Sequence, residues 1–171
     1  MSMPETVSEE RARSSTGKYM SFRLAAEEYG LEILKVREII GLLPMTRVPN
    51  KPDCMRGVIN LRGRIIPVVD LRRKFGLAAN ELGEQAVIIV VQYQQSGVDL
   101  TVGMLVDEVL EVLKLQADQV DLQPDYGNGT AKAQFVRGIG KLDQRMVFLV
   151  HLEKVLTDAE AQNLAFTGEA Q

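Results

Sequence analysis

Hydrophobic positions from Lys18 onward occur in short runs that glycine, proline and asparagine interrupt. The runs are rich in Val and Ile, and few of them reach the length of a helix; RIIPVVDL, AVIIVVQY and MVFLVHL are examples. Short runs of β-branched residues bounded by turn residues are typical of strands. The pattern therefore predicts a mostly β chain.

Helical spacing is confined to short segments. ILKVREII places apolar residues at i, i+3 and i+4, which predicts a single helical turn at Leu34–Arg37. DLRRKF also has a helical pattern, and HLEKVLTDAEAQNLAF predicts a C-terminal helix over about residues 151–163. Asp70 and His151 stand at matching positions before these two segments, so we expect a structural, helix-capping role there.

The chain contains an internal repeat in two registers. A shift of 73 places YGLEILKVREII on VGMLVDEVLEVL, with Gly30 on Gly103. A shift of 81 places MRGVINLRGRIIPVVDL on VRGIGKLDQRMVFLVHL without a gap, so that Arg56-Gly57 meets Arg137-Gly138. Two copies of one pattern imply two copies of one structural unit.

This repeat predicts two similar barrels of about five strands that share an apolar core. We expect the first barrel over about residues 18–83 and the second over about 84–150. Residues 1–17 are polar and mixed in charge, which predicts a disordered arm, and residues 164–171 are expected to form a flexible tail.

Composition narrows the possible functions. The 171 residues carry a net charge of −3 with 5% aromatics, which disfavours nucleic-acid binding because phosphate contacts need a basic surface. A single cysteine excludes an intrachain disulfide, and a single histidine excludes metal sites built on several imidazoles. No stretch approaches 18 uninterrupted apolar residues, so we expect no direct membrane insertion. The N-terminus lacks the apolar segment of a signal peptide, and the single cysteine fits a reducing compartment, so we expect a location in the cytoplasm.

Two positions invite a chemical interpretation. Asp70 follows IIPVVD as the phosphoaccepting aspartate of a receiver domain would, but the acidic pair and the alternating α/β pattern of a receiver are absent. Arg62 follows GVINL in a predicted turn, and its counterpart in the repeat is Asp143, so the fold itself does not require arginine there. A plain hairpin explains most residues around Arg62 equally well. The basic stretch over residues 51–76 is read as a solvated face that could steer an acidic partner.

Five segments, in this order and spacing, resemble the CheW family of bacterial chemotaxis coupling proteins: YGLEILKVREII, TRVPNKP, GVINLRGRIIPVVDLRRKFG, VGMLVDEVLEVL and FVRGIG. The resemblance covers about residues 18–156. It implies two five-stranded SH3-like barrels, no enzymatic activity, no cofactor and no metal. It also implies an adaptor that joins the cytoplasmic tips of chemoreceptors to the regulatory domain of the histidine kinase CheA in membrane-associated arrays.

The resemblance further implies a binding site. In this family a helical receptor tip is held in an apolar groove between the barrels, and the residues here that match the groove and its rim are Ile33, Val36, Glu38, Gly57, Val58 and Arg62. Aliphatic side chains would accept the apolar stripe of the helix, and a charge at the rim would fix its register. Val36 is expected to line an apolar surface left exposed in the isolated chain.

Overall fold

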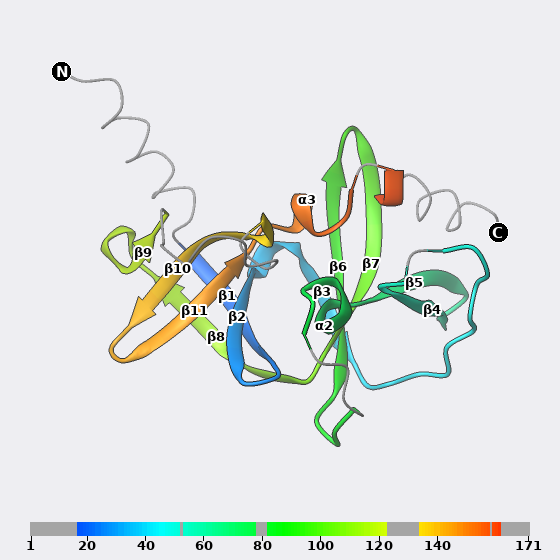
Figure 1. Ribbon diagram of the computed structural model, residues 1–171, viewed down its shortest axis with the longest axis horizontal. Coiled ribbons are helices and arrows are strands. Elements are labelled where there is room, and N and C mark those ends of the chain that lie inside the picture. The colour runs from blue at the N-terminus through cyan, green and yellow to red at the C-terminus, as the bar shows by residue number, and fades with distance from the viewer. Residues whose placement is uncertain (1–16, 52, 78–81, 123–133, 158, 162–171) are drawn as a thin grey trace.

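Two β-sheets lie side by side in the computed structural model, which describes residues 17–51, 53–77, 82–122, 134–157 and 159–161 (Figure 1). Sheet A has the strand order β8 (Glu108–Leu115), β1 (Gly17–Leu24), β2 (Glu27–Glu32), β11 (Arg145–Val150), β10 (Val136–Leu142) and β9 (Val120–Asp121). Sheet B has the order β3 (Val36–Ile40), β6 (Val87–Gln95), β7 (Val98–Val106), β5 (Arg64–Asp70) and β4 (Met55–Leu61). The predicted mostly β fold of two similar units is confirmed.

The internal repeat is confirmed in the strand register. Gly30 pairs in parallel with Leu149, and Gly103 pairs in parallel with Val68, so equivalent residues have equivalent partners. A bulge interrupts the ladder at Gly57 and again at its counterpart Gly138. The two copies therefore build the same arrangement twice.

The expected division into barrels at residues 18–83 and 84–150 is wrong, because the two copies exchange strands. Sheet B is contiguous in sequence from β3 to β7, whereas sheet A combines β1 and β2 with β8 to β11. The hairpin of β1 and β2 thus completes the sheet of the second copy. Each strand keeps the same apolar pattern whichever copy it joins, so the sequence pattern could not reveal the exchange.

Helices are few and short, as expected. One 3-10 turn, η1 (Ile33–Lys35), lies one to two residues before the predicted helical turn, and a second, η2 (Ala117–Gln119), precedes β9. Helix α2 (Leu71–Lys74) begins after Asp70, whose carboxylate accepts a hydrogen bond from the Arg72 backbone N–H, so the predicted cap is confirmed.

The C-terminal segment differs from the expectation. The predicted continuous helix over residues 151–163 is wrong: α3 (Leu152–Val155) ends at Leu156, which has an extended backbone, and helix resumes only at residues 159–161. The side chain of His151 makes no capping hydrogen bond. Gly17 already belongs to β1, so the expected arm over 1–17 is one residue too long, and residues 1–16 and 164–171 lie outside the described residues.

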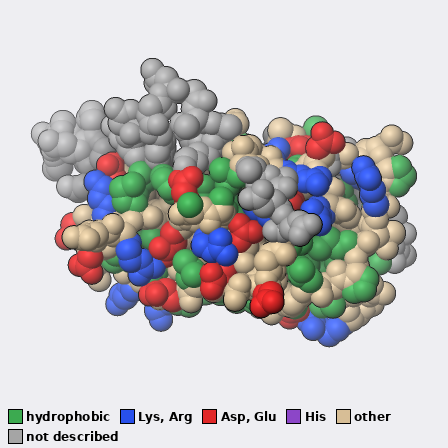
Figure 2. Space-filling model, turned by 60° about the horizontal axis from the view of Figure 1, so that its bottom comes forward, with side chains coloured by type: hydrophobic (Ala, Val, Ile, Leu, Met, Phe, Trp, Pro, Cys, Tyr) green, Lys and Arg blue, Asp and Glu red, His purple; other side chains and the backbone are tan. Residues whose placement is uncertain are grey.

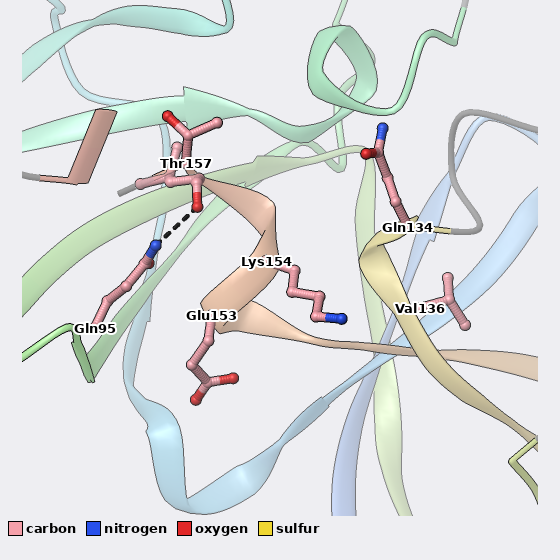
Figure 3. A pocket seen from close by; sticks show the side chains of 7 residues that line it. Gln95, Gln134, Val136, Glu153, Lys154 and Thr157 are labelled. Carbon is pink, nitrogen blue, oxygen red and sulfur yellow. Dashed lines mark hydrogen bonds between the residues drawn. The ribbon is translucent and has the colours of Figure 1, made fainter. Parts of the chain in front are cut away.

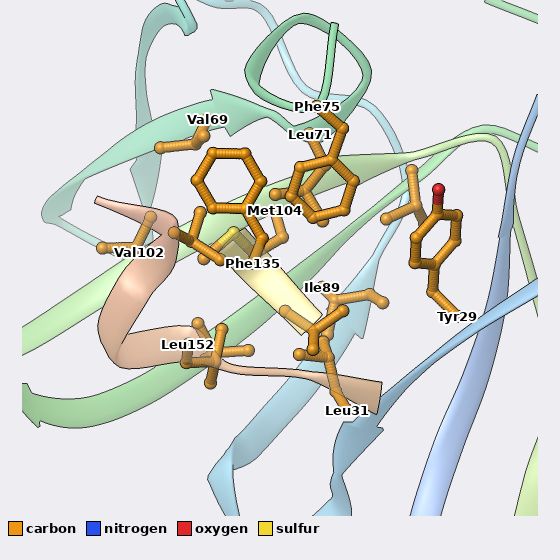
Figure 4. Packing of buried hydrophobic residues seen from close by; sticks show 14 of the residues in the cluster. Tyr29, Leu31, Val69, Leu71, Phe75, Ile89, Val102, Met104, Phe135 and Leu152 are labelled. Atoms are coloured by element: carbon orange, nitrogen blue, oxygen red, sulfur yellow. The ribbon is translucent and has the colours of Figure 1, made fainter. Parts of the chain in front are cut away.

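The hydrophobic core has three parts. Each sheet has a small core of its own, in which equivalent residues recur: Ile66 and Val68 in sheet B, Val147 and Leu149 in sheet A. A larger cluster joins both sheets, and Figure 4 shows side chains of β2, β6 and β7 packing with residues near α2 and α3. Tyr29 is at its centre, with ring centroids of Phe22, Phe75 and Phe148 within 5.9 Å. This shared cluster fixes how the sheets meet.

Candidate functional site

The structure places Glu38 and Arg62 in direct contact. Glu38 lies on the edge strand β3 and Arg62 in the turn between β4 and β5. Arg62 Nη2 donates to Glu38 Oε1 at 2.5 Å and to Oε2 at 2.6 Å. The side chain of Arg62 is 70% exposed. Two of the six residues that the resemblance implied for the binding site are therefore neighbours at the surface of sheet B.

Gly57 is buried, and contacts within the chain are enough to explain why this position is a glycine. No contact with a binding partner is needed. Its φ is +152°, and a Cβ at this position would lie 2.5 Å from the backbone oxygen of Thr46. Val58, the next residue, exchanges two backbone hydrogen bonds of 2.9 Å with Thr46. A Cβ added at the equivalent Gly138 would lie 3.0 Å from the backbone oxygen of Asp121. The structure therefore gives Gly57 an architectural role.

Ile33, Val36 and Val58 are half-buried and pack against the cluster shared by the two sheets. Val36 is the first residue of β3 and pairs with Val91. Its side chain is neither fully enclosed nor fully open, so a substitution there would act on packing as well as on any docked partner.

The most exposed apolar side chain among the described residues is one that the sequence analysis did not select. Leu34, in η1 between Ile33 and Lys35, is 93% exposed, and Ile39 and Leu42 are 41% and 45% exposed. The repeat gave no sign of this exposure, because the counterpart of Leu34 is Asp107, which is buried. The segment that joins β2 to β3 and continues along β3 thus presents apolar side chains to solvent.

Ion pairs surround this segment. Glu32 pairs with Arg137 of β10, and Lys35 pairs with Glu153 of α3. Burial raises the pKa of Glu153, but the hydrogen bond from Lys35 and neighbouring groups outweigh burial and bring the pKa below its usual value. Glu153 is therefore charged at neutral pH.

Glu153 also lines an open depression beside α3 (Figure 3). The depression has a volume of about 480 Å³, and its lining is largely polar: Gln95, Gln134, Val136, Glu153, Lys154, Leu156 and Thr157. The amide of Gln95 donates to the Leu156 carbonyl at 2.8 Å, which ties the end of α3 to β6. The lining brings together no nucleophile and base in the manner of an active site.

Asp70 is buried in a network of arginines. It has no exposed surface, and its carboxylate lies 3.4 Å from Arg72 Nε and 3.7 Å from Arg56 Nη1. Arg72 also reaches Asp107 at 3.3 Å and so links α2 to the segment between β7 and β8. A carboxylate enclosed in this way is closed to a phosphodonor, and the geometry favours the capping role.

The surface carries no large field of one sign on the face shown in Figure 2, where acidic and basic side chains are interspersed with hydrophobic ones. Within the described ranges, no group of three His, Cys, Asp or Glu residues is arranged to hold a metal ion. No helix among the described residues is long and apolar enough to cross a membrane. The features of this surface that suit protein contacts are the exposed apolar side chains of Leu34, Ile39 and Leu42 and the Glu38–Arg62 pair.

Comparisons with known proteins agree with this picture. Residues 18–160 match the CheW-like domain family. The chain is 40% identical over 155 residues to the chemotaxis protein CheW of Klebsiella aerogenes, covering 91% of this chain and 90% of that protein. It is 31% identical over 139 residues to the chemotaxis protein CheW of Helicobacter pylori, covering 81% of each.

A solved structure is also similar. The scaffolding protein TtCheW of Thermoanaerobacter tengcongensis superimposes with a TM-score of 0.73 at 32% sequence identity. The match covers 85% of this chain and 95% of that one. The similarity thus extends over nearly the whole described fold.

Proposed function

Because this chain belongs to the CheW-like family, we propose that it is a non-enzymatic adaptor that couples chemoreceptor tips to the histidine kinase CheA. The proposal is supported by the names of its relatives, which are chemotaxis proteins and a scaffolding protein. Such an adaptor works in the cytoplasm and is recruited to receptor arrays at the membrane. Its partners are the helical signalling tip of a chemoreceptor and the regulatory domain of the kinase.

One observation carries the receptor side of the proposal. The β2–β3 segment exposes Leu34 almost completely beside the half-buried Ile33 and Val36. An amphipathic helix binds by placing its apolar stripe against aliphatic side chains of this kind. The Glu38–Arg62 pair stands at the rim, where a charge selects the register of the helix.

The direct test is a titration of the full chain with two partners separately: a helical-hairpin fragment of a receptor tip and the regulatory domain of CheA. We expect both to bind, and we expect kinase activity to respond to the receptor fragment only when this chain is present. Binding of neither partner would refute the proposal. A chain that binds the kinase but leaves it insensitive to receptor would refute the coupling.

The same preparation tests the alternative of a phosphoacceptor at Asp70. Incubation with a small-molecule phosphodonor, followed by measurement of the intact mass, is expected to give no phosphate adduct because the carboxylate is enclosed by arginines. A stoichiometric adduct that Asp70→Asn abolishes would contradict the adaptor-only function.

A further inference from the structure

The chain passes between the two sheets at two places only within the described residues. One is η1 between β2 and β3, and the other is Asp107 between β7 and β8. Turn η1 has three residues, and Glu32 at its start makes no side-chain capping hydrogen bond. A 3-10 turn this short has little stability of its own. Its orientation must therefore come from contacts with other elements.

Ile33 and Val36 supply part of those contacts by packing against the cluster shared by the two sheets, and two ion pairs add one contact at each end of the turn. The carboxylate of Glu32 binds Arg137 instead of capping the turn, and Lys35 donates to Glu153. The partners are 105 and 118 residues away in sequence. Figure 3 shows Glu153 extending from α3 toward the ribbon of the β2–β3 segment. Both ends of η1 are thus held by the last part of the chain.

The other passage is held by the equivalent position of the repeat. Arg72 is the counterpart of Glu153, and its partner Asp107 is the counterpart of Leu34. This second pair is buried, with side-chain exposures of 3% and 11%, whereas Lys35 and Glu153 are 24% and 34% exposed. In both copies a charged residue of the short helix thus pairs with a residue of the passage, but the charges are reversed and the passage residue differs by one position, since Asp107 matches Leu34 and not Lys35.

The two passages between the sheets differ in the side chain that they expose to solvent. The buried pair places Asp107 inside, where it also accepts the Ala25 backbone N–H at 2.7 Å. The surface pair instead leaves Leu34 pointing into solvent between two anchored residues. An apolar side chain held on an anchored turn is ready to dock, since less conformational freedom is lost on binding.

We infer that Lys35 and Glu153 are positioning residues, which together with the Glu32–Arg137 pair hold η1 so that Leu34 and its neighbours can receive a helical partner. The inference rests on the proposed function for its partner. It assigns to α3, remote in sequence, a part in receptor docking.

The test combines hydrogen exchange of the amides of residues 33–36 in the free protein with affinity for the receptor-tip fragment. The variants are Lys35→Met, Glu153→Gln and the two combined, with Lys35→Arg as the conservative replacement. Lys141→Met is the matched control, because it removes an exposed ion pair with Asp121 at the far edge of sheet A. Melting curves show that each variant is folded.

We expect each single variant, Lys35→Met or Glu153→Gln, to accelerate hydrogen exchange at residues 33–36 about tenfold. Each should also lower the affinity for the receptor-tip fragment about fivefold. The double variant should be no worse than either single one, because the two residues act as a pair. Lys35→Arg should retain affinity, and the control should behave as wild type.

Unchanged exchange and affinity in folded variants would overturn the inference. Additive losses of affinity without faster exchange would also overturn it, because they would mean that both residues touch the partner directly. If the wild-type chain binds no receptor fragment, the proposed function fails, while the exchange measurement still decides whether the pair holds η1.

Discussion

Arg62 Nη2 lies 2.5 Å from one oxygen of Glu38 and 2.6 Å from the other, so one guanidinium nitrogen joins the β4–β5 turn to the edge strand β3. Arg62 has a positive φ of 52°, and its counterpart Asp143 has a φ of 53° in the equivalent turn. The two turns share a backbone conformation but carry opposite charges. The conformation therefore belongs to the fold, whereas the charge of Arg62 is free to serve binding.

Arg62→Ala should weaken binding of the receptor-tip fragment, or coupling to the kinase, at least about tenfold, which corresponds to roughly 1.4 kcal/mol. Its melting temperature should hardly change, because a pair this exposed contributes little to stability. Titration of both partners alongside melting curves checks this. Arg64→Ala is the control, since Arg64 is also exposed and contacts only Thr101 among the interactions seen here. Equal affinities for Arg62→Ala and wild type would reduce Arg62 to a solvated turn residue.

Gly57→Ala should lower stability without any partner present. A Cβ would meet the Thr46 oxygen at 2.5 Å, and the φ of +152° is strained for any other residue. A strained backbone of this kind costs about 1–3 kcal/mol, and the clash adds to that cost. Urea unfolding measures the loss. Gly41→Ala serves as the comparison, because an added Cβ meets nothing within 4 Å there. If both variants unfold at the same urea concentration, Gly57 is not architectural.

Tyr29→Phe should leave the melting temperature unchanged or raise it. The Tyr29 side chain is fully buried among aromatic rings, and its hydroxyl has no hydrogen-bond partner in the described structure. Removing a buried unsatisfied hydroxyl costs little.

Ser21→Ala should instead destabilise by about 1–3 kcal/mol, because the Ser21 hydroxyl bonds both the N–H and the carbonyl of Glu111 at the β1–β8 bulge. Calorimetry of both variants tests the contrast, and a marked loss in Tyr29→Phe would reveal a bond to that hydroxyl.

His151 should make stability depend on pH below about 7. Burial lowers its pKa below 6.5; the nearby Glu153 opposes this shift, and Arg137, Lys154 and Lys35 reinforce it. The unfolded chain therefore binds a proton before the folded protein does, so the free energy of unfolding falls as the pH drops below about 6.5. The free energy of unfolding levels off only below the pKa that His151 has in the folded protein.

Urea unfolding at several pH values measures this slope. His151→Gln should flatten it, and since the chain has one histidine no other imidazole contributes. The carboxylates act lower in the pH range: the pKa of Glu160 is raised by burial but lowered on balance by the bond from Lys74 and by Thr157, so its stabilisation is lost only below about pH 4.5. An unchanged slope in His151→Gln would contradict the assignment.

Local patterns predicted the strands, the repeat and the cap at Asp70 because each depends on neighbouring residues. The equivalence of Gly30 with Gly103 was visible since both must be small: a Cβ on Gly30 would meet Val147 of the parallel neighbour β11 at 3.2 Å, and a Cβ on Gly103 would meet Ile88 of the antiparallel neighbour β6 at 2.7 Å. The assignment of strands to sheets was not visible, because exchange between copies alters no residue's burial pattern.

The candidate site was predicted unevenly for a similar reason. Glu38 and Arg62 came from motifs and proved to be in contact. Lys35, Arg137 and Glu153 escaped notice because their partners lie more than 100 residues away. Leu34 resembled a core residue within ILKV, and only the three-dimensional turn shows that it faces solvent.

The exchange of strands also sets an order of events during synthesis. Sheet B is complete once β7 has left the ribosome, whereas β1 and β2 must wait for partners: Ser21 for Glu111, 90 residues later, and Glu28 for Arg145, 117 residues later. At about 5–20 residues per second this second delay lasts roughly 6–23 s. During that time the first hairpin made lacks the strands of its own sheet, and Tyr29 lacks its contact with Phe148.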